Sequence, residues 1–161
     1  MIRERREQDL QRLCAILVDI NYPSSSLSER TLKEWLEEGD AEQSWVFDMA
    51  PVRVAPTKNV VGHVQIVRPT QEFSASCVSD RMGVSRDQLA IQKLFVRPHD
   101  HAYGVGRYLL KESVKYIQGQ GKLPVLDLHG NPFLSKGFCE KFGFEEVASG
   151  DPGVAPMIYT S

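Results

Sequence analysis

The sequence has no long apolar run and no excess of basic charge. No stretch approaches the roughly 18 apolar residues that a membrane-spanning helix needs, and the opening MIRERREQDL contains no apolar signal core. Lys and Arg number 19 against 21 Asp and Glu, which gives a formal net charge of -2. General nucleic-acid binders usually carry a strong basic excess. We therefore expect a cytoplasmic protein whose partner is neither a membrane nor a nucleic acid.

Cysteine and the usual signatures of metal, hydrolase and nucleotide chemistry are also scarce. The three cysteines form an odd number without a C-x-x-C spacing, which disfavours a disulfide framework and a zinc ribbon. His99 and His101, one residue apart on a predicted loop, and His129 lack the fixed third ligand of a metal site. The sequence has no G-x-S-x-G motif, Walker-type lysine or RNA-binding aromatic pair. We expect reduced thiols and no metal ion.

What is present is a chain of one-domain length with clear hydrophobic periods. Its 161 residues predict a single domain over residues 1–161. Apolar residues at helical spacing, between capping and breaking residues, predict helices over residues 10–20, 31–38, 105–118 and 133–142. β-Branched and aromatic runs predict strands over residues 2–5, 44–50, 59–67, 89–96, 123–129, 144–149 and 155–160.

The order of these elements predicts an α/β (α+β) fold with a mixed sheet. A helix joins the strands at residues 89–96 and 123–129, so the two strands lie parallel with a right-handed crossover. Residues 68–87, rich in Ser with Pro and Gly, predict a long loop, and loops of that length are usually functional or mobile. Gly62 predicts a bulge in its strand, and Asn131-Pro132 predicts the start of the last helix. Open α/β sheets bind ligands at the carboxyl ends of their strands, which places the site after residue 96.

The stretch LAIQKLFVRPHDHAYGVGRYLL, residues 89–110, is built like a phosphate cradle. A strand-forming run ends at Val96, and Pro98 stops it. Gly104 and Gly106 then let the backbone approach an anion where a helix begins. The first N–H groups of a helix are bare and lie at the positive end of its dipole, which suits a diphosphate. A plain tight turn explains the same glycine pair, and the spacing alone leaves both interpretations open.

These residues resemble the central motif of the GNAT superfamily of N-acetyltransferases. In that motif a strand ends in Val, Pro follows two residues later, and Arg/Gln-x-x-Gly-x-Gly/Ala comes next. This chain has Val96, Pro98, His101, Gly104 and Gly106 at those places. His101 replaces the usual Arg or Gln, which weakens the charge at the diphosphate but leaves the backbone cradle. The family's C-terminal signature, aromatic-Tyr-Glu-Lys-x-Gly-Phe, is matched by FCEKFGF at residues 138–144, so the resemblance spans nearly the whole chain.

The resemblance implies a fold and a co-substrate. The fold is a GNAT-like mixed, mostly antiparallel sheet of about seven strands flanked by about four helices, with the fourth and fifth strands parallel and splayed. The co-substrate is acetyl-CoA, whose pantetheine pairs with the fourth strand and whose diphosphate lies on N–H groups around the glycines. The implied cofactor-binding residues are Leu94, Phe95, Val96, His101, Ala102, Tyr103, Gly104, Val105, Gly106, Arg107 and Asn131. A solvated side chain is the alternative for Arg107, and an Asx cap is the alternative for Asn131, which lies one residue further from the C-terminal signature than usual.

Acyl transfer from a thioester to an amine needs a neutral nucleophile, an oxyanion donor and release of the thiolate. By resemblance, the backbone N–H of Leu94 polarises the thioester carbonyl. Cys139 stands where many relatives carry the Tyr that protonates the departing sulfur. Besides this acid role, Cys139 could be a residue that only packs in the core or a nucleophile that becomes acylated. Gln92 stands where some relatives carry a Glu base, and it accepts no proton at neutral pH, so it orients a water or the acceptor. The remaining base candidates, with no preference among them, are His63, Glu72, Asp80, Asp87 and His129.

The resemblance and these residues together predict an N-acetyltransferase. It moves an acetyl group from acetyl-CoA to a primary amine of an unidentified small molecule or peptide, by direct transfer in a ternary complex. The departures at Gln92 and Cys139 keep open a catalytically weak or inactive CoA-binding regulatory module. An acyltransferase that uses a longer acyl chain or a hydroxyl acceptor is a further alternative. In this fold the acceptor enters between the first helices and the connection before the fourth strand, here residues 21–27 and 68–87, and homodimers through the last strands are common.

Overall fold

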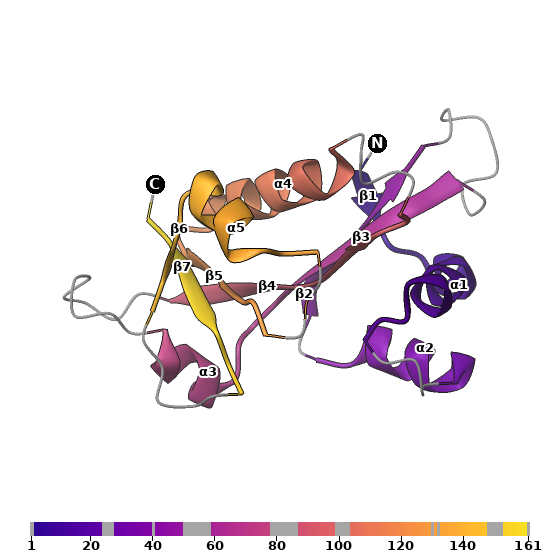
Figure 1. The fold of residues 1–161 in the computed structure, drawn as a ribbon, viewed down its shortest axis with the longest axis horizontal. Coiled ribbons are helices and arrows are strands. Elements are labelled where there is room, and N and C mark those ends of the chain that lie inside the picture. Colours follow the sequence, from indigo (N-terminus) through magenta and orange to yellow (C-terminus); the bar gives the residue numbers. More distant parts are fainter. Residues whose placement is uncertain are drawn as a thin grey trace.

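A seven-stranded sheet forms the centre of the molecule, with strands in the order β1-β2-β3-β4-β5-β7-β6 (Figure 1). The computed structural model describes residues 2–23, 28–39, 41–49, 59–77, 87–98, 104–129, 131, 133–147 and 153–160. The strands are β1 (Ile2–Glu4), β2 (Ala41–Asp48), β3 (Val60–Val67), β4 (Gln88–Val96), β5 (Leu123–Asp127), β6 (Phe144–Glu146) and β7 (Pro156–Tyr159). The helices are the 3-10 turn η1 (Glu7–Asp9), α1 (Leu10–Ile20), α2 (Glu29–Glu37), α3 (Gln71–Ser76), α4 (Val105–Gly119) and α5 (Lys136–Phe142). None of these helices is both long and apolar enough to cross a membrane.

The sheet is mixed in the way the sequence predicts. β4 and β5 run parallel, with α4 as the crossover between them. The other described neighbours, from β1 with β2 to β6 with β7, pair antiparallel. The expectation of a mostly antiparallel seven-stranded sheet with a parallel fourth and fifth strand is therefore confirmed.

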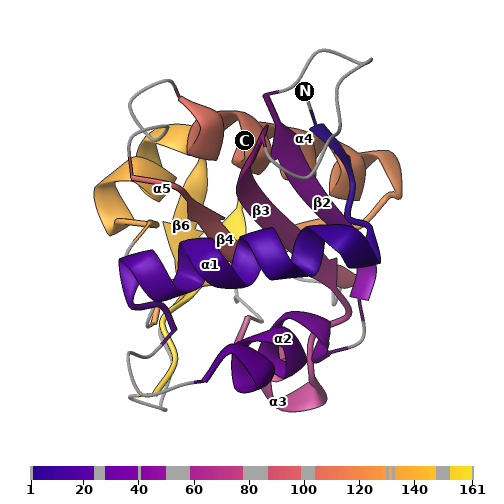
Figure 2. The ribbon, with the colours of Figure 1, turned by 90° about the vertical axis from the view of Figure 1, so that its right-hand side faces the viewer.

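Helices cover both faces of this sheet (Figures 1 and 2). On one face, α4 and α5 pack against the strands in an apolar cluster that includes Leu94 and Leu109. On the other face, α1 and α2 pack over a cluster that includes Val46 and Phe95, and α3 lies apart from them, below β5 and β7 in Figure 1. Leu94 and Phe95 are adjacent in β4 and belong to opposite clusters, because successive strand side chains point to opposite faces. The central strands are therefore covered by apolar side chains on both sides.

Two helices differ from the sequence expectation. Residues 68–87 do not form one long loop, because Thr70 caps the six-residue helix α3 by accepting a hydrogen bond from Phe73 N–H. The last helix begins at Lys136 and not at Asn131-Pro132, with Ser135 as its N-cap. In both cases one hydroxyl satisfies an N–H of the first turn, and such a short cap is hard to distinguish among neighbouring polar residues. Residues 78–86 lie outside the described ranges.

Gly62 lies beside a bulge, as predicted, and lets α4 approach the sheet. The register of β2 against β3 shifts next to the pair of Phe47 with Gly62. A Cβ atom at Gly62 would lie 3.1 Å from Leu109 Cδ1 and 3.2 Å from Val105 Cγ1. A side chain at this position would therefore push away the first turns of α4, which begin just beyond the carboxyl end of β4.

Candidate active site

β4 and β5 separate before β4 ends. Residues 88–91 of β4 pair with residues 123–126 of β5. β5 ends one residue later, at Asp127, whereas β4 continues to Val96. Beyond Ile91, β4 therefore pairs with β3 on one side and with no described strand on the other. This is the splay that the resemblance implied, and it leaves a strand edge without a described neighbour at the carboxyl end of a parallel pair.

A bulge at Lys93 accompanies the separation. The register of β3 against β4 shifts between His63 and Gln65, where β4 holds one extra residue, and such a bulge bends and twists its strand. Lys93 has a φ of 53°, a left-handed conformation that costs a non-glycine residue about 1 kcal/mol. Its Nζ donates hydrogen bonds to the carbonyls of Trp35 and Glu38, both at 2.6 Å, and lies 5.2 Å from the Trp35 ring centroid. These contacts tie the end of α2 to the bulge and offset the strain.

The open edge of β4 presents the amides of Leu94 and Val96. Arg97 N–H donates to a β3 carbonyl at 2.8 Å. Because the amides of alternate residues point to the same side of a strand, Phe95 also faces β3, whereas Leu94 and Val96 face the opposite side. The Leu94 carbonyl also points away from β3, because it accepts a hydrogen bond from Asn131 Nδ2 at 3.3 Å. Two backbone N–H groups therefore point toward the side of β4 on which β5 no longer pairs with it.

The start of α4 has no side-chain cap. Its N-cap is Gly104, with a φ of 76°, and the Gly104 carbonyl accepts the first helical hydrogen bond from Tyr108 N–H at 3.0 Å. The N–H groups of Val105, Gly106 and Arg107 therefore have no acceptor within the helix. Bare N–H groups at the positive end of a 15-residue helix suit an anion. The predicted contacts His101, Ala102 and Tyr103 lie outside the described residues.

A pocket of about 560 Å3 lies beside the same strands, on the face that carries α3. Its walls are formed by Gly39, Val67, Arg68, Pro69, Thr70, Phe73, Ala90, Ile91, Gln92, Asp127 and Val154. Four of these residues, Arg68 to Thr70 and Phe73, belong to the connection in which we expected the acceptor. Gln92 is held by a chain of hydrogen bonds: its Nε2 donates to Gln65 Oε1, and Gln65 Nε2 donates to Ser44 Oγ, each at 3.1 Å. Among the described residues, none donates a hydrogen bond to Gln92 Oε1.

His63, one of the predicted base candidates, is a buried and fully satisfied residue. Its Nδ1 lies 2.8 Å from the Lys93 carbonyl, its Nε2 lies 3.1 Å from Arg5 Nη1, and its ring stacks on Phe95 with centroids 5.1 Å apart. A guanidinium only donates, so Nε2 is the acceptor and Nδ1 carries the proton. Burial lowers the pKa of His63 to about 3. The ring stays neutral and has no solvent exposure through which to reach an acceptor.

Of the other predicted base candidates, His129, Glu72 and Asp87 are exposed and do not line the pocket. Asp80 lies outside the described residues. Among the described residues, the acid that lines the pocket is Asp127, which the sequence analysis did not select. The available signal was a lone carboxylate inside the apolar strand LPVLDL. Among the described residues, no group of three or more His, Cys, Asp or Glu side chains is placed to hold a metal ion.

Cys139 lies inside the core. Its side chain is 0% exposed and belongs to the apolar cluster between α4, α5 and the sheet. Burial raises the pKa of the Cys139 thiol to about 11, so the thiol is protonated at neutral pH. A protonated thiol surrounded by apolar side chains has the environment of a packing residue.

Asn131 does not cap the last helix, whose N-cap is Ser135, and its contact with the cofactor stays a prediction. Its Oδ1 accepts a hydrogen bond from Phe133 N–H at 2.9 Å, which closes an Asx turn in the connection before α5. Its Nδ2 donates to the Leu94 carbonyl. The side chain therefore joins the loop after β5 to the open edge of β4.

Comparison with known proteins identifies the fold. Neither a scan against protein-family models nor a search of curated proteins finds a match. NAA60 of Arabidopsis thaliana, solved in complex with acetyl-CoA, matches with a TM-score of 0.69 and 19% identity over 99% of this chain and 97% of that one. Ard1 of Thermoplasma volcanium matches with a TM-score of 0.67 and 18% identity over 100% and 98%. A GNAT family acetyltransferase of Brucella melitensis in complex with acetyl-CoA matches with a TM-score of 0.59 and 18% identity over 100% of this chain and 96% of that one. The chain adopts the GNAT fold.

Proposed function

We propose that this chain is an N-acetyltransferase that moves an acetyl group from acetyl-CoA to a primary amine by direct transfer in a ternary complex. The observation that carries the proposal is the open edge of β4, where the N–H groups of Leu94 and Val96 face the side that β5 leaves. The uncapped start of α4 follows after residues 97–104. Two proteins of the same fold were solved with acetyl-CoA, which supports the choice of co-substrate.

Acetyl-CoA matches the chemistry of both features. Its pantetheine arm carries amides, and amides pair with an unpaired strand edge. We assign this contact to Leu94, Phe95 and Val96. The backbone N–H groups that face the pantetheine are those of Leu94 and Val96. Its diphosphate suits the bare N–H groups at the start of α4. To this contact we assign Gly104, Val105, Gly106 and Arg107, and by motif resemblance His101, Ala102 and Tyr103. Asn131 borders the same edge through its hydrogen bond to Leu94.

The transfer step requires little from side chains. The acceptor ammonium first loses a proton to solvent water, and the neutral nitrogen then attacks the thioester carbonyl carbon. Negative charge develops on the carbonyl oxygen, where the Leu94 N–H is the proposed donor. The C–S bond breaks as the oxyanion collapses, the amide nitrogen loses its second proton, and the CoA thiolate takes up a proton. A thiolate is a tolerable leaving group near neutral pH, so the step proceeds with Cys139 as a packing residue.

Gln92 is proposed to act on the acceptor and not as a base. Its amide is oriented from β2 through Gln65, and its Oε1 is left for a hydrogen bond from the incoming amine or a water. A carboxamide accepts no proton at neutral pH, so this role is one of positioning.

The test separates binding from transfer on the purified full chain. Isothermal titration with acetyl-CoA measures binding, and a thiol-release assay with amino acids, spermidine, kanamycin and short peptides measures transfer. We expect binding together with thiol release on at least one amine. Binding without release on any amine would favour the CoA-binding module. No binding of acetyl-CoA would overturn the proposal.

The proposal covers the whole chain as one domain over residues 1–161 in the cytoplasm. The matches to NAA60 and Ard1 cover 99% and 100% of the chain, and its three cysteines are buried and form no disulfide, which suits a reducing compartment.

A further inference from the structure

Gln92 and Asp127 are the first residues of β4 and β5 beyond the last pair of the two strands. That pair is Ile91 with Leu126, and the strands separate immediately after it. Residues at matching positions of parallel neighbours point their side chains to the same face of a sheet. Both side chains line the pocket of about 560 Å3. The pocket therefore receives one polar group from each strand at the point where acetyl transfer is proposed.

The Asp127 carboxylate is fixed through one oxygen and open at the other. Its Oδ1 accepts hydrogen bonds from His129 N–H at 2.9 Å and from Ala155 N–H at 2.8 Å. No described residue donates a hydrogen bond to Oδ2. A half-buried carboxylate with one unused oxygen on a pocket wall is a ready acceptor for a cationic group.

Most of the remaining pocket wall is apolar. It includes Val67, Pro69, Phe73, Ala90, Ile91 and Val154. A ligand with many hydroxyl or amino groups would leave them without partners against this wall, which is costly in a pocket.

We infer that this pocket selects a primary monoamine with an apolar body, whose ammonium group is bound by Asp127 Oδ2 beside Gln92 Oε1. An ammonium has three N–H donors, and these two oxygens accept two of them. The inference rests on the proposed function and names the class of its acceptor. It favours an arylalkylamine over a polyamine or an aminoglycoside. Asp127 is thereby a substrate-binding residue.

The first test measures binding without turnover. Phenethylamine is titrated into the full chain in the presence of free CoA, and ligand-detected NMR reports the dissociation constant. Asp127→Asn keeps an oxygen for the two backbone N–H groups and removes the charge. We expect it to weaken phenethylamine binding by about tenfold or more. Asp19→Asn, which alters an exposed carboxylate of α1 outside the pocket, should leave binding unchanged.

The second test compares acceptors under turnover. With acetyl-CoA present, kcat/KM from thiol release should be about tenfold or more higher for phenethylamine than for spermidine or kanamycin. Asp127→Asn should raise the KM for phenethylamine and leave the dissociation constant of acetyl-CoA unchanged.

The outcomes distinguish the inference from the proposed function. Equal phenethylamine binding by wild type and Asp127→Asn, or a preference for spermidine, would overturn the inference while acetyl transfer stands. Binding of phenethylamine that depends on Asp127, with no thiol release on any amine, would overturn the proposed transfer while the pocket assignment stands.

Discussion

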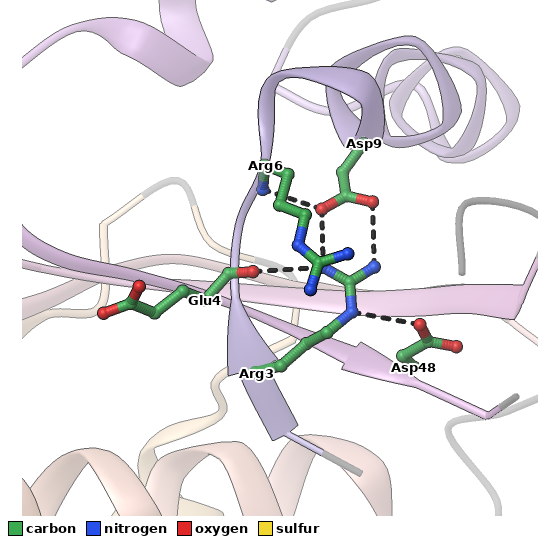
Figure 3. A network of polar contacts seen from close by, with 5 residues as sticks. All are labelled: Arg3, Glu4, Arg6, Asp9 and Asp48. Atoms are coloured by element: carbon green, nitrogen blue, oxygen red, sulfur yellow. Dashed lines mark hydrogen bonds and ion pairs between the residues drawn. The ribbon is translucent and has the colours of Figure 1, made fainter. Parts of the chain in front are cut away.

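Arg3 binds Asp9 through two parallel hydrogen bonds, from Nη1 at 2.8 Å and from Nη2 at 2.9 Å (Figure 3). Its Nε also donates to Asp48 at 3.0 Å, and the backbone N–H of Arg6 donates to Asp9 at 2.8 Å. Both carboxylates are buried. One guanidinium of β1 therefore donates hydrogen bonds to two buried carboxylates and ties together β1, η1 and the end of β2.

Replacing Arg3 with Met should lower the free energy of unfolding at pH 7 by about 3 kcal/mol, because two buried carboxylates lose their hydrogen bonds from Arg3. Burial by itself raises the pKa of Asp9, but the hydrogen bonds from Arg3 and Arg6 outweigh it and lower the pKa. Ionised Asp9 thus contributes stability above pH about 4 that is lost as the pH falls through its lower folded pKa. In the Arg3→Met variant the hydrogen bonds from Arg3 are gone, so burial raises the pKa of Asp9. The difference in unfolding free energy between wild type and variant should therefore shrink as the pH falls below about 5.

Urea denaturation at pH 7, 5 and 4 measures this prediction. Arg30→Met is the matched control, because its pair with Glu34 is highly exposed and exposed pairs contribute little. The prediction would be contradicted if the two substitutions lowered the free energy of unfolding equally. It would also be contradicted if the loss caused by Arg3→Met were constant over this pH range.

His63 should stay neutral through the whole range in which an ordinary histidine titrates. Burial lowers its pKa to about 3, whereas in the unfolded chain it takes up a proton near pH 6.5. As the pH falls from 6.5 toward 3, the unfolded state therefore gains a proton that the folded state lacks, and this residue lowers stability by up to about 1.4 kcal/mol per pH unit. Nitrogen-15 NMR, assigned with His63→Gln, should show a protonated Nδ1 and constant shifts from pH 8 to pH 5. A titration near pH 6.5 would be evidence against the buried pairing with Arg5 and Lys93.

Gly104 and Gly121 provide a matched pair at the two ends of α4. Their φ values are 76° and 72°, and a Cβ atom at either position would meet no other atom within 4 Å. Valine should therefore strain both positions alike, at about 1 kcal/mol each. Gly104→Val should weaken acetyl-CoA binding by about tenfold by disturbing the N–H groups that receive the diphosphate, whereas Gly121→Val should not. Isothermal titration measures both, and unchanged affinity in a folded variant with valine at Gly104 and Gly106 would refute the assignment of the co-substrate site.

Cys139→Ala should retain turnover within about tenfold of the wild type, because a CoA thiolate leaves without a strong acid. The free energy of unfolding should fall by about 1 kcal/mol, since a buried apolar atom is lost from the core. Thiol-release kinetics and urea denaturation measure the two effects, with Cys139→Ser as a variant that keeps a proton donor. Complete loss of turnover in Cys139→Ala, restored in Cys139→Ser and with acetyl-CoA binding intact, would instead establish an acid role.

Local sequence was sufficient for most elements of the fold. The predicted range of α1 agrees with the structure, and each predicted strand is present with boundaries shifted by a few residues. These segments are long enough for their apolar residues to show a helical or an alternating period. The helix α3 and the start of α5 were not predicted, because each depends on one capping hydroxyl, at Thr70 and Ser135.

The amino-acid sequence by itself determined the parallel pair at β4 and β5 and the glycine motif before α4, since both follow from residues that are neighbours along the chain. Only the tertiary structure decided what surrounds the site. The bulge residue Lys93 is held by Trp35, 58 positions away, and Asp127 reaches the pocket beside Gln92. Such contacts depend on the register and separation of strands distant in sequence, and no local pattern of side chains encodes them.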